Sequence, residues 1–154
     1  MEREQLQEKV GVPLEFGPGW DNLLISFLSR LEAMQKEWLW FKAPEDSTCG
    51  QPAPGKLFEF IFLQTKEKYG ELRIYYQIAS VEQDWEIFDK EEYEKKIYSI
   101  QERVEGMVDL LEELSGHICE NCGAKGEIQE RYGWFRCSCK NCFGFEQALN
   151  DLKK

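Results

Sequence analysis

Five of the chain's six cysteines fall within residues 119–142, where their spacing is that of metal-ligating thiolates. Cys119 and Cys122 form one Cys-x2-Cys pair, and Cys139 and Cys142 form a second. Sixteen residues separate the two pairs, a spacing typical of sites in which four thiolates surround one Zn²⁺. Each pair holds two sulfurs on one tight turn, so that both can reach the same ion at about 2.3 Å. The sequence therefore predicts a structural zinc ion bound by these four residues.

Two neighbouring side chains could change this ligand set. Cys137 precedes Cys139 by two residues and is an alternate ligand, a buried thiol or a spare nucleophile. His117 could replace one of the thiolates, although its position directly after an expected helix favours a role in capping the helix carbonyls. Cys49 stands alone in a loop, and its distance along the chain from the other cysteines makes it a poor ligand.

A site of four thiolates keeps no coordination position for water or substrate, so it stabilises a fold without doing chemistry. The catalytic zinc of nucleotide deaminases is accompanied by His-x-Glu and Pro-Cys-x-x-Cys motifs, and the sequence contains neither. An enzyme would have to use Cys49 or Cys137 as a nucleophile, or Glu59 and Glu71 facing each other across a hairpin. With one histidine, no glycine-rich phosphate loop and no nucleophile elbow, no convergent catalytic set can be named. We therefore expect a non-catalytic protein.

The N-terminal elements can be predicted from the spacing of apolar side chains. Residues 1–18 are polar at first and are then interrupted by two prolines and a glycine, which predicts an irregular lead-in with order beginning near Gly19. From Trp20 to Trp38, apolar residues recur every three or four positions, which predicts a helix with one broad apolar stripe. Residues 42–55 contain three prolines and two glycines and are expected to form a long loop.

A hairpin and a long helix are expected next. The runs 57–63 and 72–78 are rich in aromatic and branched residues, which predicts two strands joined through a polar segment that turns near Gly70. A helix should begin at Asp89, whose side chain can cap it in a capping box with Glu92, and should end at Gly116. Its apolar seam consists of Ile97, Ile100, Val104, Met107 or Val108, Leu111 and Leu114.

These elements predict an α+β fold in two parts. Residues 1–116 would contain the N-terminal helix, the antiparallel hairpin or small sheet, and the long helix. Residues 117–154 would form a C-terminal zinc-ribbon-like module attached to the end of that helix. The long helix spans about 40 Å at 1.5 Å per residue, which leaves open whether its seam packs on its own hairpin or on a second copy in a homodimer.

The charge of the chain limits its partners. The net charge is −10 and the isoelectric point is near 4.7, which disfavours binding along an extended nucleic-acid backbone and favours a basic protein surface. The long helix has nine acidic against four basic residues between Asp89 and Gly116. Its acidic face is either simply solvated or a docking strip for a basic partner. The strip would comprise Glu102, Glu105, Asp109 and Glu112.

Three segments together resemble a group of small, largely uncharacterised phage and prophage zinc-knuckle proteins. They are Gly-Trp at 19–20 opening a helix, Gln-Thr-Lys-Glu-Lys-Tyr-Gly-Glu-Leu-Arg-Ile-Tyr-Tyr at 64–76, and Cys-Glu-Asn-Cys-Gly at 119–123 followed by Tyr-Gly-Trp-Phe-Arg-Cys-Ser-Cys-Lys-Asn-Cys at 132–142. The chain departs from the group's pattern in having both Cys137 and Cys142 near Cys139, in the second half of the site. The resemblance implies an origin in a mobile element, where small acidic proteins often bind and disable a host factor. It implies no catalytic residues.

The leading hypothesis is therefore a phage-encoded modulator or inhibitor of a host protein, such as a defence system or a nucleic-acid enzyme. The N-terminus has no apolar signal core and the apolar runs are far shorter than the about 20 residues that span a bilayer, so we expect the host cytoplasm and no membrane. The alternative is a nucleic-acid-binding zinc-ribbon protein that uses Arg131, Trp134 and Arg136. Against it, the three aromatic residues at 132, 134 and 135 are more simply explained as the miniature core of the module.

Overall fold

The computed structural model of the protein describes residues 1–37, 57–83, 85 and 89–143 and has an α+β fold, as the sequence predicts. Cys49, Trp38 and the expected loop at 42–55 lie outside the described residues. In chain order the elements are α1 (Arg3–Val10), β1 (Leu14–Glu15), the 3₁₀ helix η1 (Pro18–Trp20), α2 (Asp21–Glu37), β2 (Phe58–Lys68), β3 (Glu71–Ser80), α3 (Lys90–Ser115), β4 (Glu127–Arg131) and β5 (Trp134–Ser138).

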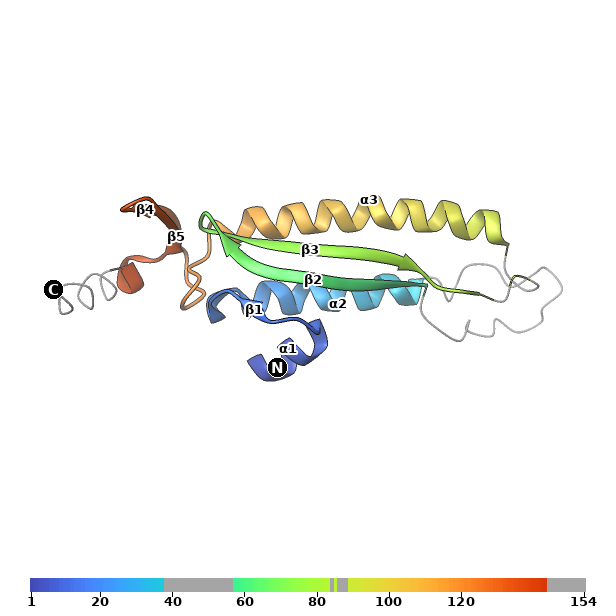
Figure 1. The fold of residues 1–154 in the computed structure, drawn as a ribbon, viewed down its shortest axis with the longest axis horizontal. Coiled ribbons are helices and arrows are strands. Elements are labelled where there is room, and N and C mark those ends of the chain that lie inside the picture. The colour runs from blue at the N-terminus through green and yellow to red at the C-terminus, as the bar shows by residue number, and fades with distance from the viewer. Residues whose placement is uncertain (38–56, 84, 86–88, 144–154) are drawn as a thin grey trace.

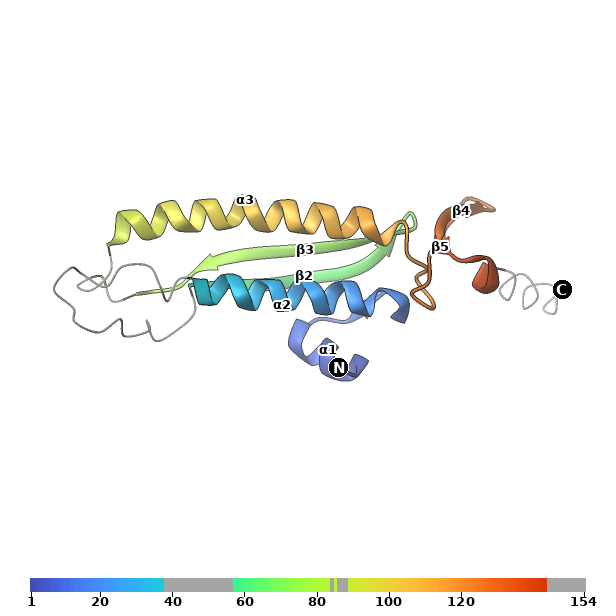
Figure 2. The same ribbon diagram turned by 180° about the vertical axis from the view of Figure 1, so that it is seen from behind.

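A long hairpin of β2 and β3 forms the middle of an elongated molecule, with α2 and α3 running alongside it and the β4–β5 hairpin at one end (Figures 1 and 2). The sheet order is β1-β2-β3, and β4 and β5 form a second, two-stranded sheet. One hydrophobic core joins α1, α2, the hairpin and α3. Its largest fully buried apolar side chains are Trp20, Phe58, Leu6, Leu24, Met34, Leu57, Leu72 and Ile100.

The N-terminal segment is more regular than the sequence predicts. Residues 3–10 form α1 instead of an irregular lead-in, because Leu6 and Val10 lie one turn apart and both are buried in the core. The Arg3 guanidinium forms an ion pair with Asp21 at the start of α2. Residues 14–15 then add β1 as a parallel strand beside β2, with Leu14 opposite Thr65.

The hairpin turn is tighter than predicted. The strands continue through the polar segment, and Lys68 pairs with Glu71 across a two-residue turn at Tyr69 and Gly70. Both turn residues have positive φ, 56° and 83°, which is the backbone form of a type I′ turn. The polar residues before the turn lie in β2 because each of them pairs with a residue of β3.

The register also separates two carboxylates that the sequence could have brought together. Glu59 lies opposite Ala79, whereas Glu71 lies opposite Lys68 at the other end of the hairpin. The hypothesis of a Glu59–Glu71 pair facing across the strands is therefore wrong.

Helix α3 begins and ends where the sequence predicts. The Asp89 carboxylate accepts hydrogen bonds from the N–H groups of Glu91 and Glu92, and Gly116 follows the last helical residue. Its apolar seam is buried from Ile97 to Leu111 against the hairpin and α2 of the same chain. Leu114, which was expected to continue the seam, is 43% exposed, and the buried position in the last turn is Ser115. Gly116 has φ of −66°, so the glycine is not needed for a left-handed cap. An added Cβ there would lie 3.2 Å from the Ile128 side chain in β4, so the glycine permits close packing between α3 and β4.

The C-terminal end of α3 closes the open edge of β3. The Leu72 N–H donates to the Ser115 hydroxyl at 2.7 Å, and the Ile74 N–H donates to Glu112 Oε1 at 2.9 Å. Side chains of α3 thus take the place that another strand would occupy, which removes part of a sheet edge that could pair with other chains.

Candidate metal centre

The structure brings together the four cysteines that the sequence predicts as ligands. The Sγ atoms of Cys119, Cys122, Cys139 and Cys142 all lie within 4.8 Å of one another. Those of Cys122 and Cys139 are 3.6 Å apart. A tetrahedral ion with metal–sulfur bonds of about 2.3 Å would separate its sulfurs by about 3.8 Å, so the donor set fits one metal ion. This cysteine cluster can therefore bind a metal.

Each ligand pair is held by backbone hydrogen bonds in a tight turn. In the first turn the Gly123 N–H donates to the Cys119 carbonyl at 2.9 Å, and Gly123 has φ of 78°, which suits a glycine. The Cys119 N–H in turn donates to the Ala124 carbonyl at 2.7 Å. The second turn follows β5, where the Phe143 N–H donates to the Cys139 carbonyl at 3.0 Å. The β4–β5 hairpin connects the turns and brings them face to face.

Hydrogen-bond donors around the sulfurs favour thiolates, but four thiolates oppose one another. The Cys142 N–H lies 3.5 Å from the Cys139 sulfur, and it lowers the pKa of that thiol to about 7. The Asn121 side-chain amide donates to the Cys142 sulfur at 3.3 Å and favours its thiolate. Burial and the other three sulfurs outweigh this bond and raise the pKa of Cys142 to about 12. A bound cation would remove the conflict, because it neutralises the charges that repel one another.

Two candidate ligands stand apart from the cysteine cluster. Cys137 is not part of the group of sulfurs, and it is buried in the core beside β4. Burial first, and then the nearby Cys119, raise the pKa of Cys137 to about 11. Of the three interpretations of this residue, a buried thiol agrees with its place. His117 is exposed, and its ring makes no hydrogen bond to any described residue, so the structure does not show it capping α3 or joining the ligands.

Sequence reasoning missed the contact between the first ligand turn and the N-terminal segment. The Gly19 N–H donates to the Glu120 carbonyl at 2.6 Å, and the Gly17 N–H donates to Glu120 Oε1 at 2.9 Å. The Trp20 indole donates to the Ile118 carbonyl at 2.8 Å. A Cβ at Gly19 would overlap the Cys119 carbonyl oxygen. The Gly-Pro-Gly-Trp sequence at 17–20 was the available signal, since its glycines allow two backbones to touch.

Comparisons with known proteins do not indicate a function, so the function has to be inferred from the site. No protein-family model matches the chain, and neither a curated protein nor a solved structure was found to resemble it. Among the described residues, no helix has both the length and the apolar character required to cross a bilayer.

The predicted acidic strip divides into an exposed part and an engaged part. Glu102, Glu105 and Asp109 are exposed on α3. The Glu112 side chain is only 18% exposed, because its carboxylate accepts the Ile74 N–H and lies 3.3 Å from the Arg73 guanidinium. The carboxylates of α3 also affect Tyr76 in β3. Burial first, and then the negative charges at positions 105, 109 and 112, raise the pKa of Tyr76.

The aromatic residues of the β4–β5 hairpin lie on the surface. Tyr132 is 84% exposed, Trp134 is 80% exposed and Phe135 is 40% exposed. The prediction that they form the miniature core of the module is therefore wrong. Its buried apolar positions include Cys119 and Cys137 instead, so the rings are free to contact other molecules.

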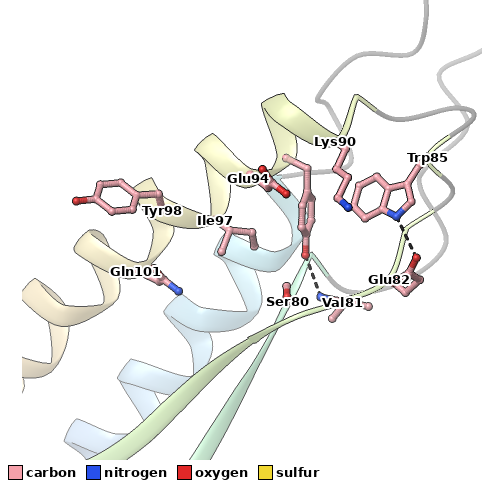
Figure 3. Close-up of a pocket in the computed structure, with 10 residues that line it drawn as sticks. Ser80, Val81, Glu82, Trp85, Lys90, Glu94, Ile97, Tyr98 and Gln101 are labelled. Carbon is pink, nitrogen blue, oxygen red and sulfur yellow. Dashed lines mark hydrogen bonds between the residues drawn. The ribbon is translucent and has the colours of Figure 1, made fainter.

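A separate pocket of about 460 Å³ lies where the end of β3 meets the start of α3 (Figure 3). The Tyr93 hydroxyl donates to the Leu57 carbonyl at 2.8 Å and accepts from the Val81 N–H at 2.9 Å. The Trp85 indole donates to Glu82 at 3.0 Å. The two Tyr93 bonds fasten the end of the hairpin to α3, whereas the Trp85 bond lies within the segment that precedes α3.

Proposed function

We propose that the protein is a non-catalytic binding module that recognises a basic surface on another protein through the acidic strip of α3. The observation that carries the proposal is the exposure of Glu102, Glu105 and Asp109, which share one helix face at the i, i+3, i+7 spacing. Among the described residues, none of these three carboxylates forms an ion pair. By contrast, Glu91 and Glu92 in the first turn lie 3.4 and 3.6 Å from Lys95.

The strip is held on a rigid support, which suits recognition. Helix α3 is fixed along its buried seam and, near its end, by Ser115 and Glu112 bound to the edge of β3. A preorganised acidic surface loses little conformational entropy on binding. Its charge would steer a basic partner and set partner choice and association rate more than raw affinity.

The cysteine cluster supports the same proposal as a structural zinc site. Tetrahedral thiolate sites favour zinc over the hard cations, and four thiolates leave no open position for catalysis. Elemental analysis and native mass spectrometry of the purified protein should find one zinc per chain. A different metal, or a coordination sphere that contains water, would count against a purely structural site.

The resemblance to phage and prophage zinc-knuckle proteins guides the choice of partner. We propose that the partner is a host protein in the cytoplasm, such as a component of a defence system or a nucleic-acid enzyme. A basic surface that otherwise holds DNA or RNA is the expected target, because it already complements closely spaced negative charges.

Charge reversal tests the strip. A variant with Glu102→Lys, Glu105→Lys and Asp109→Lys is compared with a matched variant, Glu91→Lys, Glu92→Lys and Glu94→Lys, which makes the same change in net charge at the other end of α3. Glu112 is left intact because it binds β3. Affinity capture from a host lysate should retain the partner with the matched variant and lose it with the first. Retention by the first variant at moderate salt, or equal loss from both, would refute the acidic strip.

A further inference from the structure

Two hairpin turns with the same unusual composition meet at the end of the molecule that carries the cysteine cluster. One turn is Tyr69-Gly70 and the other is Tyr132-Gly133, and the tyrosines have φ of 56° and 51°. Positive φ is rare for a bulky side chain, and Asn, Asp or Gly normally occupies this position of a type I′ turn. Unfavourable backbone at an exposed position is a mark of functional sites.

The two turns form one surface. The rings of Tyr69 and Phe135 contact each other edge to face, with centroids 6.0 Å apart. An added Cβ at Gly70 would lie 2.9 Å from the Ile128 side chain, which shows how closely the β2–β3 turn approaches β4. Figures 1 and 2 show this turn beside β4 and β5 in both views. We call the surface of Lys68, Tyr69, Arg131, Tyr132, Trp134 and Phe135 the aromatic end.

The aromatic end presents open ring faces above a hollow. Tyr69 is 66% exposed, and Tyr132 and Trp134 are still more exposed. A hollow of about 330 Å³ lies between Tyr132, Trp134, Phe135 and Phe143. Exposing several neighbouring rings to water is unfavourable in free energy, and a group of this kind marks a binding surface.

Cations border these rings. The Lys68 ammonium lies 5.5 Å from the Tyr69 ring, and the Arg131 guanidinium lies 5.9 Å from the Tyr132 ring and 5.5 Å from the Phe143 ring. The nearby carboxylates of Glu67 and Glu130 accept hydrogen bonds from the turn N–H groups of Gly70 and Gly133, at 2.7 and 3.1 Å. The carboxylates therefore hold the turns, while the cations lie beside the exposed rings.

We propose that the aromatic end binds a short stretch of single-stranded nucleic acid. Bases would stack on Trp134 and Tyr132, and Arg131 and Lys68 would contact the adjacent phosphates. The net charge of −10 restricts the contact to a few unpaired nucleotides, because a duplex would bring many more phosphates towards the acidic remainder of the molecule. The site does not use the acidic strip, so it can fail or succeed independently of the proposed partner on α3.

Fluorescence anisotropy with labelled single-stranded DNA and RNA of about 12 nucleotides, at low salt, tests the proposal. The wild type should bind both, and Trp134→Ala should weaken binding about tenfold. Tyr98→Ala is the matched control, because Tyr98 is another largely exposed ring, 66% exposed on α3, and this variant should bind as the wild type does. Metal content and circular dichroism should be unchanged in both variants.

A second variant separates binding from folding. Tyr132→Asn removes the ring but places a residue that tolerates positive φ in the turn. It should raise the melting temperature and still weaken oligonucleotide binding several-fold. If Tyr132 served only the fold, the Tyr132→Asn variant would bind the oligonucleotide as tightly as the wild type does.

Three results would overturn the proposal. They are no binding of single strands at low salt, binding that is indifferent to Trp134→Ala, and a duplex that binds as tightly as the single strand. A protein captured from lysate through Trp134, with no oligonucleotide binding, would assign the aromatic end to a protein partner instead.

Discussion

At the scale of single residues, the amide of Asn121 links the two ligand turns. It belongs to the first turn, and it donates to the sulfur of Cys142 in the second at 3.3 Å. A donor directed at a thiolate disperses its negative charge and fixes its position, so residues behind the ligands contribute to metal affinity.

We predict that Asn121→Ala lowers zinc affinity by about 10- to 100-fold, the usual effect of removing such a partner. Asn141→Ala is the matched control, because Asn141 occupies the same place between the ligands of the second turn, is exposed, and makes no hydrogen bond to a described residue. Competition with a chromophoric chelator measures both affinities. Equal affinities of the two variants would show that the Asn121 amide does not act on the metal.

The ligands could be predicted from the sequence because two sulfurs on one tight turn are a local property of Cys-x2-Cys. The role of Cys137 could not be predicted from the sequence, because its burial depends on how β5 packs against the core. The exposure of Trp134 and Tyr132 was likewise hidden, since composition alone does not tell whether an aromatic residue near a metal faces inwards. The sequence did not distinguish Glu112 from its acidic neighbours on α3, because its hydrogen bond to the Ile74 N–H depends on how α3 packs against the edge of β3.

At the scale of elements, α3 stabilises the hairpin through side chains as well as through its seam. The Ser115 hydroxyl is buried and accepts the N–H of Leu72, which is also buried. A buried N–H without an acceptor costs the full penalty of its lost hydration.

We predict that Ser115→Ala lowers the free energy of unfolding by about 1–3 kcal/mol, because it leaves the Leu72 N–H without its acceptor. Ser99→Ala on the exposed side of α3 should be neutral or raise stability by up to about 0.5 kcal/mol through helix propensity. Urea unfolding of both variants at fixed zinc gives the two values. A Ser115→Ala variant as stable as Ser99→Ala would mean that another group satisfies the Leu72 N–H.

Helices α2 and α3 could be predicted from the sequence, because their apolar residues repeat regularly over many positions. The elements that could not be predicted are short or polar. Helix α1 buries only Leu6 and Val10, so its apolar pattern was too brief to recognise. The polar ends of β2 and β3 are strands because they pair with each other, and pairing is not visible in the composition of either segment.

At the scale of the whole molecule, the metal module and the N-terminal segment are joined through backbone contacts. The Glu120 carbonyl, within the first ligand turn, accepts the Gly19 N–H, and the Ile118 carbonyl accepts the Trp20 indole. Trp20 is fully buried in the main core, so the ligand turn is tied directly to the packing of the α+β domain. Binding or loss of the metal should therefore change the stability of the N-terminal segment at residues 17–20.

We predict that removing the metal unfolds residues 117–143 and also loosens residues 17–20, because small modules with few buried apolar groups depend on their metal. Hydrogen exchange with and without chelator should show protection lost in both segments and kept in the middle of α3. Gly19→Ala should loosen residues 17–20 even with metal bound, because the added Cβ overlaps the Cys119 carbonyl. Gly106→Ala, which meets nothing within 4 Å, should not. Full protection of residues 17–20 in the metal-free protein would show that their docking is independent of the metal.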